Sequence, residues 1–196
     1  MSVDERMVHD IVQKVMANMQ ISGSVSGMHG VFKDMNDAIN ASIEAQKKVC
    51  TMTLDQREQI ISLIRKKTHE NAEILANMGV NETGMGNVGD KILKHHLTAD
   101  KVPGTEDIST IAWSGDRGLT LVEMGPFGVI GAITPATNPS ETVICNCIGM
   151  LAGGNTVVFN PHPNAKKTTI YTINMINEAS IEAGGPDNIA VTVEAP

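Results

Sequence analysis

Apolar residues recur at intervals of three or four along the first half of the chain, and this spacing is typical of amphipathic helices. Three such helices are predicted, at residues 34–49, 53–78 and 89–100. Thr53 and Gln56 have the spacing of a capping box, in which the side chain of each residue accepts a hydrogen bond from the backbone N–H of the other. The longest of the three helices is therefore expected to begin at Thr53.

A different pattern begins near residue 126. Residues 128–134 predict a short buried strand, and residues 155–160 and 188–195 predict two further strands. The segments between them, 138–151 and 164–183, have helical spacing and end at glycine pairs. Parallel strands joined by helices form the α/β sheets that bind nucleotides. We therefore predict an α/β fold whose Rossmann-type parallel sheet follows a helical N-terminal region.

Two further segments complete the predicted organisation. The turn sequence SGDRG separates two short apolar runs and predicts a β-hairpin. The chain begins with an amphipathic segment and a stretch rich in Gly and Ser, which is the composition of a flexible linker. The expected order is an N-terminal helix, a linker, a helical region, a hairpin and the first half of a cofactor-binding domain, at residues 1–20, 21–30, 31–107, 108–125 and 126–196.

Both ends of this organisation raise a question. The apolar stripe of the N-terminal helix must pack either on its own domain or in a groove of another protein. At the other end, the chain stops directly after the third predicted strand, which would leave the sheet with an unpaired edge. We therefore expect a domain that needs more chain to complete it.

Composition excludes several classes of function. The formal net charge is -7 and aromatic residues make up 3% of the chain, which argues against nucleic-acid binding through phosphate contacts or base stacking. The chain has 3 cysteines, an odd and low number that suits a reducing compartment. No apolar run approaches about 18 residues, so no membrane span is expected. We expect a soluble, cytoplasmic protein.

The sequence ITPATNPSET, at residues 133–142, joins the first predicted strand to the helix that follows it. Asn138 suits the N-cap of that helix, and Pro139 suits its first position. Ligands of such sheets bind outside the carboxyl ends of the strands. Asn138 could therefore cap the helix, or its rigidly held amide could donate a hydrogen bond to an oxyanion. These roles do not exclude each other.

The end of the second strand carries the next candidate residues. In many dehydrogenases an acidic residue at this position binds a ribose hydroxyl, but here the strand ends at neutral Asn160. The choice between NAD and NADP therefore stays open. Cys145 and Cys147 have only one residue between them, which is fewer than metal-binding cysteine pairs usually have, and no second pair accompanies them. We predict that both cysteines are structural and that the chain has no metal site.

Four stretches together resemble the CoA-acylating aldehyde dehydrogenases. They are NETGMGNVGDK (81–91), EMGPFGVIGAITPATNPSETVICN (123–146), LAGGNTVVFNPHPNAKK (151–167) and EAGGPDNIAVTVEAP (182–196). Within that family the chain is most similar to the acetaldehyde and propionaldehyde dehydrogenases of bacterial microcompartments. The resemblance runs nearly continuously from residue 31 to residue 196, and the helix and linker before it resemble the tags that direct such enzymes into a microcompartment.

The resemblance implies roles for particular residues. The asparagine of the TNP corner matches Asn138, whose amide would stabilise the oxyanion of the thiohemiacetal. The loop beside the nicotinamide of NAD, and later beside the thiol arm of coenzyme A, matches Thr134, Pro135, Ala136 and Thr137. The strand end along the adenosine part matches Asn160, Pro161 and His162. A lysine usually stands at the position of Asn160 in the wider superfamily, so the ribose contact is expected to be looser here.

The resemblance also implies an overall function. A short-chain aldehyde, coenzyme A and NAD would be converted to acyl-CoA and NADH in the lumen of a microcompartment, with the N-terminal helix bound to a shell protein and the full-length enzyme forming a homo-oligomer. The nucleophilic cysteine of the family lies downstream of these motifs, and none of Cys50, Cys145 and Cys147 aligns with it. The 196-residue chain alone is therefore expected to be inactive. The alternative is a non-catalytic module for targeting or assembly, or a fragment that only binds NAD or CoA.

Overall fold

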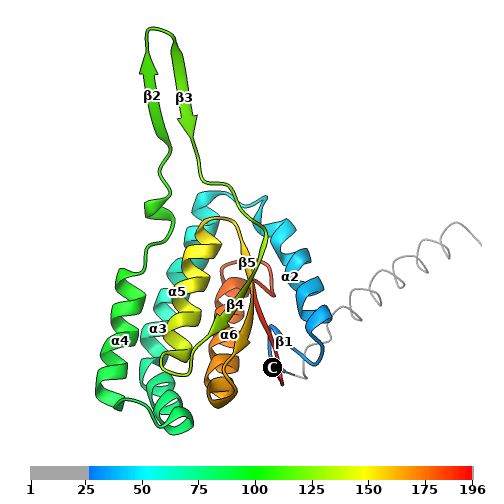
Figure 1. Cartoon of the computed structure of the whole chain (residues 1–196), viewed down its shortest axis with the longest axis vertical. Coiled ribbons are helices and arrows are strands. Elements are labelled where there is room, and N and C mark those ends of the chain that lie inside the picture. Colours follow the sequence, from blue (N-terminus) through cyan, green and yellow to red (C-terminus); the bar gives the residue numbers. More distant parts are fainter. Residues whose placement is uncertain (1–26, 196) are drawn as a thin grey trace, which may run out of the picture.

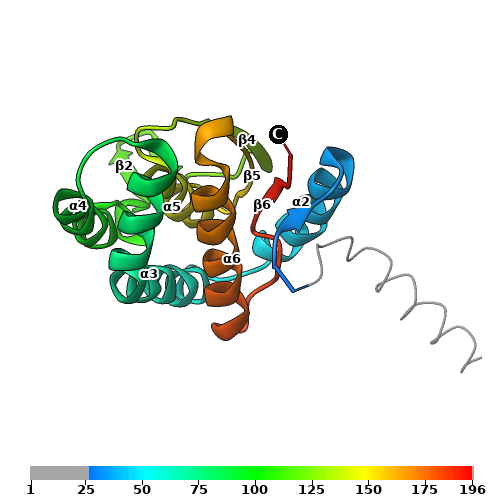
Figure 2. The same ribbon diagram turned by 90° about the horizontal axis from the view of Figure 1, so that it is seen from below.

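The computed structural model describes residues 27–195. The predicted N-terminal helix at 1–20, and most of the linker at 21–30, lie outside this range. The described chain forms a parallel four-stranded sheet with helices on both faces and a long hairpin that projects from one end (Figure 1). Helix α2 (Met35–Val49) covers one face, and α5 (Pro139–Ala152) and α6 (Lys166–Glu182) cover the other (Figure 2). The predicted α/β fold is thus confirmed.

The order of the strands in the sheet is β1-β6-β5-β4, and every neighbouring pair is parallel. The three predicted strands correspond to β4 (Val129–Thr134), β5 (Thr156–Pro161) and β6 (Ala190–Val193). The sequence did not predict β1 (Val31–Phe32), because two residues are too few to show a period. Their pairing with β6 makes them part of the sheet.

Strand β4 lies at one edge of the sheet. The expectation that this strand is buried is wrong for part of its length, since Ile133 is 86% exposed. Strand β5, which has neighbours on both sides, is buried from Thr156 to Phe159. The two strands have similar apolar sequences, so their different exposure follows from their places in the sheet and not from their composition.

Two further helices pack outside α5 and α6. Helix α3 (Leu54–Thr83) is longer than predicted and ends at Gly84, which has a left-handed φ of 68°. The capping box of Thr53 and Gln56 at its start is confirmed. Helix α4 (Val88–Lys101) packs against α3 and α5. Short 3₁₀ turns at Thr105–Asp107 and Pro163–Ala165 connect these elements to the strands.

The main hydrophobic core lies between α3, α5, α6 and the sheet. Its buried aliphatic side chains include Ile60 and Ile64 of α3, Ile144 and Ile148 of α5, and Ile176 of α6. Removing such side chains from water contributes about 25 cal/mol for each Å² of apolar surface. The helical region before the hairpin and the strand-containing region after it therefore share one core.

The predicted hairpin is confirmed as β2 (Ile111–Gly115) and β3 (Gly118–Val122), an antiparallel pair in which Trp113 lies opposite Thr120. It extends away from the sheet (Figure 1), and every residue of both strands is exposed. No helix within residues 27–195 combines the length and the apolar character that crossing a lipid bilayer requires.

Candidate functional site

The carboxyl ends of β4 and β5 lie side by side and bring the two groups of predicted residues together. Thr134 at the end of β4 is in register with Pro161 at the end of β5. The backbone N–H of His162 donates a hydrogen bond to the carbonyl oxygen of Thr134, with 3.1 Å between nitrogen and oxygen. The corner at 134–138 and the strand end at 160–162 therefore meet at the carboxyl ends of β4 and β5, and we refer to these two segments together as the edge formed by β4 and β5.

Asn138 stands at the N-cap position of α5 but does not cap the helix with its side chain. Its carbonyl oxygen accepts the first helical hydrogen bond from Thr142 at 3.1 Å, whereas its side chain makes no capping bond. The amide oxygen Oδ1 instead accepts a hydrogen bond from Nζ of Lys94, on α4, at 2.9 Å. The interpretation of Asn138 as only a capping residue is therefore wrong.

Lys91, on α4, contacts the corner through a buried side chain. Its side chain is almost fully buried, and its Nζ donates to the carbonyl oxygen of Thr137 at 3.0 Å. The same Nζ lies 3.5 Å from Oε1 of Glu141, which is also buried. A buried cation is tolerated only where a counter-charge and polar partners compensate for its lost hydration. Here Glu141 supplies the charge and the Thr137 carbonyl supplies the hydrogen bond.

His95 forms a second contact between α4 and α5. Its Nδ1–H donates to the carbonyl oxygen of Lys91, and its Nε2 accepts a hydrogen bond from the Ser140 hydroxyl, each at 2.7 Å. We assign this tautomer because a carbonyl can only accept a hydrogen bond. Burial lowers the pKa of His95, although the charge of Glu141 opposes that shift. The neutral imidazole thus links the two helices.

The predicted cofactor-binding residues differ in exposure. Pro135, Thr137, Asn160 and His162 are exposed, and Asn138 is half-buried. The buried members of the predicted set are Thr134, Ala136 and Pro161. A ligand at this edge would therefore contact the exposed side chains, while the buried side chains would hold the backbone of the two segments in place.

A wide, open hollow lies beside this edge, on the face of the sheet that α2 covers. Its volume is about 510 Å³. Its lining is mostly apolar and consists of Met35, Ile39, Val129, Gly131, Ala132, Ile133, Val158 and Asn160. Apolar walls with a few polar groups are typical of sites for cofactors and small molecules. Ile133 and Asn160, which are opposite each other in the sheet, connect the hollow to the corner.

Cys145 and Cys147 are buried or half-buried, as expected of structural residues. Cys147 is buried in the main core, and burial raises the pKa of its thiol to about 12. Burial also raises the pKa of Cys145, and the nearby charge of Glu141 adds to this effect. A raised pKa suppresses the thiolate form that attacks carbonyl groups. Within residues 27–195, no group of three or more His, Cys, Asp or Glu side chains is arranged to hold a metal ion.

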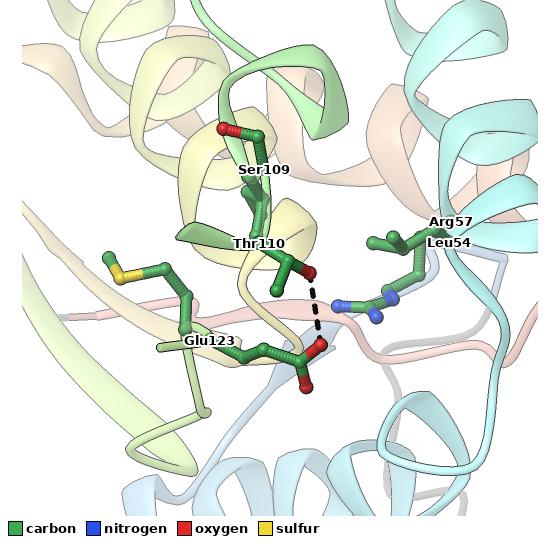
Figure 3. Close-up of a pocket in the computed structure, with 7 residues that line it drawn as sticks. Leu54, Arg57, Ser109, Thr110 and Glu123 are labelled. Atoms are coloured by element: carbon green, nitrogen blue, oxygen red, sulfur yellow. Dashed lines mark hydrogen bonds between the residues drawn. The ribbon is translucent and has the colours of Figure 1, made fainter. Parts of the chain in front are cut away.

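A second, smaller hollow lies at the base of the hairpin, and Figure 3 shows its side chains. Its volume is about 140 Å³, and Leu54, Arg57, Ser109, Thr110 and Glu123 contribute to its lining. The Thr110 hydroxyl donates to Oε1 of Glu123 at 3.0 Å, next to the guanidinium of Arg57 (Figure 3). None of the predicted site residues lines it, so we assign it to the attachment of the hairpin to α3.

Sequence reasoning missed the contribution of α4 to the site. Lys91, Lys94 and His95 contact residues within the segment 137–140, although they precede these partners by more than 40 residues in the chain. Their one local signal is their spacing, since residues three and four apart share a helix face. That spacing does not identify what the face contacts.

A parallel four-stranded sheet with helices on both faces defines the chain as an α/β protein. The model of the aldehyde dehydrogenase family matches residues 16–194. The chain therefore belongs to the aldehyde dehydrogenase family.

Particular relatives narrow the similarity to CoA-acylating members. A propionaldehyde dehydrogenase from the fucose utilisation bacterial microcompartment of Clostridium phytofermentans is 73% identical, with a TM-score of 0.84 over 86% of this chain and 39% of that one. The propionaldehyde dehydrogenase of Rhodopseudomonas palustris, solved with bound propionyl-CoA, is 47% identical, with a TM-score of 0.83 over 85% of this chain and 37% of that one.

A third relative extends the match over almost the whole chain. The acetylating acetaldehyde dehydrogenase of Bilophila wadsworthia is 46% identical over 201 residues, which cover 98% of this chain and 41% of that protein. The chain thus spans about two fifths of the length of these relatives. The resemblance to CoA-acylating acetaldehyde and propionaldehyde dehydrogenases, including those of microcompartments, is confirmed.

Proposed function

We propose that this chain is the cofactor-binding part of a CoA-acylating aldehyde dehydrogenase. The reaction converts a short-chain aldehyde, coenzyme A and NAD⁺ into acyl-CoA, NADH and a proton. The observation that carries the proposal is the edge formed by β4 and β5, where the corner at 134–138 begins, at Thr134, next to the strand end at 160–162. Relatives that resemble the chain closely carry the names of acylating acetaldehyde and propionaldehyde dehydrogenases.

The residues present fit a dinucleotide and, in its turn, coenzyme A. Asn160 is exposed and neutral, and it borders the apolar hollow beside the edge. With Pro161 and His162 it would hold the adenosine part that both ligands share, while the loop at 134–137 would lie along their reactive ends. NAD supplies the hydride acceptor when it is bound. A neutral strand end carries no carboxylate that would repel the additional phosphate of NADP or coenzyme A.

The proposed role of Asn138 is to stabilise negative charge on the aldehyde oxygen. Its amide is held at the start of α5, where the positive end of the helix dipole favours the same charge. In the complete enzyme, Asn138→Ala should lower kcat for acylation by about 10²- to 10³-fold, the usual effect of losing one such donor. Asn146→Ala, on the same helix, is the matched control. An unchanged rate in Asn138→Ala would remove Asn138 from the mechanism.

We further propose that the reaction needs a nucleophilic cysteine outside these 196 residues. Cys147 and Cys145 both have raised pKa values through burial and are unsuited to the role. The purified 196-residue chain should form no NADH from acetaldehyde, NAD and CoA, but calorimetric titration should detect binding of NAD or CoA. Acetaldehyde oxidation by the chain alone would refute this division, and absence of binding would favour the non-catalytic alternative.

The N-terminal segment at 1–20 is proposed to direct the enzyme into a microcompartment through a shell protein. The support is its amphipathic sequence, and a relative that is 73% identical belongs to a fucose utilisation microcompartment. Deleting residues 1–20 from the complete enzyme should leave kcat unchanged and abolish co-purification with shell proteins. Loss of folding on deletion would favour the other interpretation, in which the helix packs on its own domain.

A further inference from the structure

Helix α4 approaches the corner with three side chains from one of its faces. Lys91, Lys94 and His95 are spaced at intervals of three and four residues, and each contacts a different residue of the segment 137–140. Lys91 and His95 are buried, whereas Lys94 is exposed. The two buried contacts hold α4 against the start of α5, so the exposed contact is made from a helix that is itself anchored.

The exposed contact determines how the amide of Asn138 is oriented. A lysine ammonium has only donor hydrogens, and the side-chain amide has one acceptor, the oxygen Oδ1. The 2.9 Å contact with Lys94 therefore places Oδ1 toward α4 and Nδ2 away from it. Among the residues that the structure describes, Nδ2 has no hydrogen-bond partner. Its two hydrogens are thus left to a ligand, and the cation on the oxygen increases their acidity.

We propose that Lys94 is a positioning residue for Asn138: it holds the amide with Nδ2 directed at the substrate oxygen. This inference rests on the proposed function of the corner. Without Lys94 the amide can rotate by half a turn and present its oxygen, which would repel a developing oxyanion. The contact acts on the transition state and not on cofactor binding, so its loss should lower kcat and leave the KM values for NAD and CoA unchanged.

The first experiment compares three lysine variants of the complete enzyme. Lys94→Met keeps the length of the side chain and removes its donors, and kcat for acylation should fall about tenfold, which is the usual effect of one hydrogen bond to a charged group. Lys94→Arg restores a donor and should recover most of the lost rate. Lys101→Met, which changes an exposed lysine on the same helix, is the control and should match the wild type.

A double-mutant cycle then separates positioning from a general effect on the fold. In an Asn138→Ala background Lys94→Met should have no further effect, because there is no amide left to orient. A tenfold loss in both backgrounds would overturn the proposal, and so would a kcat in Lys94→Met equal to that of the wild type. Equal melting temperatures of all variants would confirm that the comparison concerns intact enzyme.

A spectroscopic readout keeps this inference distinct from the proposed function. In ¹⁵N-labelled enzyme, the side-chain NH₂ signal that disappears in Asn138→Ala is the amide signal of Asn138. Lys94→Met should shift that signal, whereas Lys101→Met should leave it in place. A shifted signal in an enzyme that fails to acylate CoA would uphold the contact and refute the proposed function, and an unshifted signal would refute the contact itself.

Discussion

The Ser140 hydroxyl lies 2.7 Å from Nε2 of His95, and this hydrogen bond joins the start of α5 to α4 in the protein interior. Both side chains are fully or almost fully buried. Burial lowers the pKa of His95 and favours the neutral imidazole, in which Nδ1 donates its hydrogen to the Lys91 carbonyl and Nε2 accepts from Ser140. The geometry beneath Asn138 therefore depends on the protonation state of a histidine whose hydrogen-bond partners here, Lys91 and Ser140, are outside the predicted set of site residues.

This relationship predicts a loss of stability in mild acid. Burial lowers the pKa of His95 below its ordinary value of 6.5, so the unfolded chain binds a proton more readily than the folded chain does. Stability is then fully present above pH 6.5 and decreases as the pH falls through that value toward the lower folded pKa. Melting temperatures measured between pH 8 and pH 5 should fall more steeply in the wild type than in His95→Gln.

His162→Gln is the control for this experiment, since it changes a histidine that is exposed to solvent. The difference between the two variants isolates the contribution of the buried imidazole. If His95→Gln and the wild type give parallel curves, the buried imidazole of His95 is not the group whose protonation lowers the stability in acid.

The capping contacts predict a contrast between two helix starts. Thr53 accepts a hydrogen bond from the backbone N–H of Gln56 at 3.2 Å, whereas Asn138 makes no such bond with its side chain. Thr53→Ala should therefore lower the free energy of unfolding by about 1 kcal/mol, the usual cost of losing a cap. Asn138→Ala should change it by less than about 0.5 kcal/mol, because its half-buried side chain makes no capping bond. Urea denaturation of both variants checks the contrast, and equal losses would restore the capping role of Asn138.

The start of α6 predicts a third effect. No residue of its own caps this helix, but the carboxylate of Glu82, at the end of α3, accepts hydrogen bonds from the backbone N–H groups of Lys167 and Thr168 at 2.7 and 2.8 Å. Glu82→Ala should lower the free energy of unfolding by about 1–3 kcal/mol, because these bonds are assisted by charge and by the helix dipole. Glu73→Ala, on the exposed face of α3, is the control and should be nearly neutral in urea denaturation.

The cysteines predict an order of chemical reactivity. Cys50 is exposed at the end of α2, whereas Cys147 is buried and burial raises its pKa to about 12. Iodoacetamide at neutral pH should therefore modify Cys50 first, and Cys147 should react only after unfolding. Mass spectrometry of the native and the urea-treated protein gives the sites and their order. Modification of Cys147 in the native protein would mean that the core around α5 opens readily.

Much of the local structure follows directly from the sequence. The helical periods, the capping box at Thr53 and the alternation of strands and helices after residue 126 are properties of short segments, and local hydrogen bonding and apolar spacing determine them. The four stretches at 81–91, 123–146, 151–167 and 182–196 together resemble the family to which the chain belongs. The two-residue strand β1 was not predicted, since it exists only because β6 provides its partners.

The arrangement of the corner, in contrast, is a result of tertiary packing. Asn138 directly precedes a helix whose first residue is Pro139, and this sequence predicts a side-chain cap. In the folded protein, however, Lys94 of another helix donates a hydrogen bond to the amide oxygen of Asn138. The exposure of β4 likewise depends on its place at the edge of the sheet. A local pattern determines which hydrogen bonds a segment can make by itself. Only the fold determines which distant donor competes for them, because a lysine 44 residues away becomes a neighbour only when α4 packs against α5.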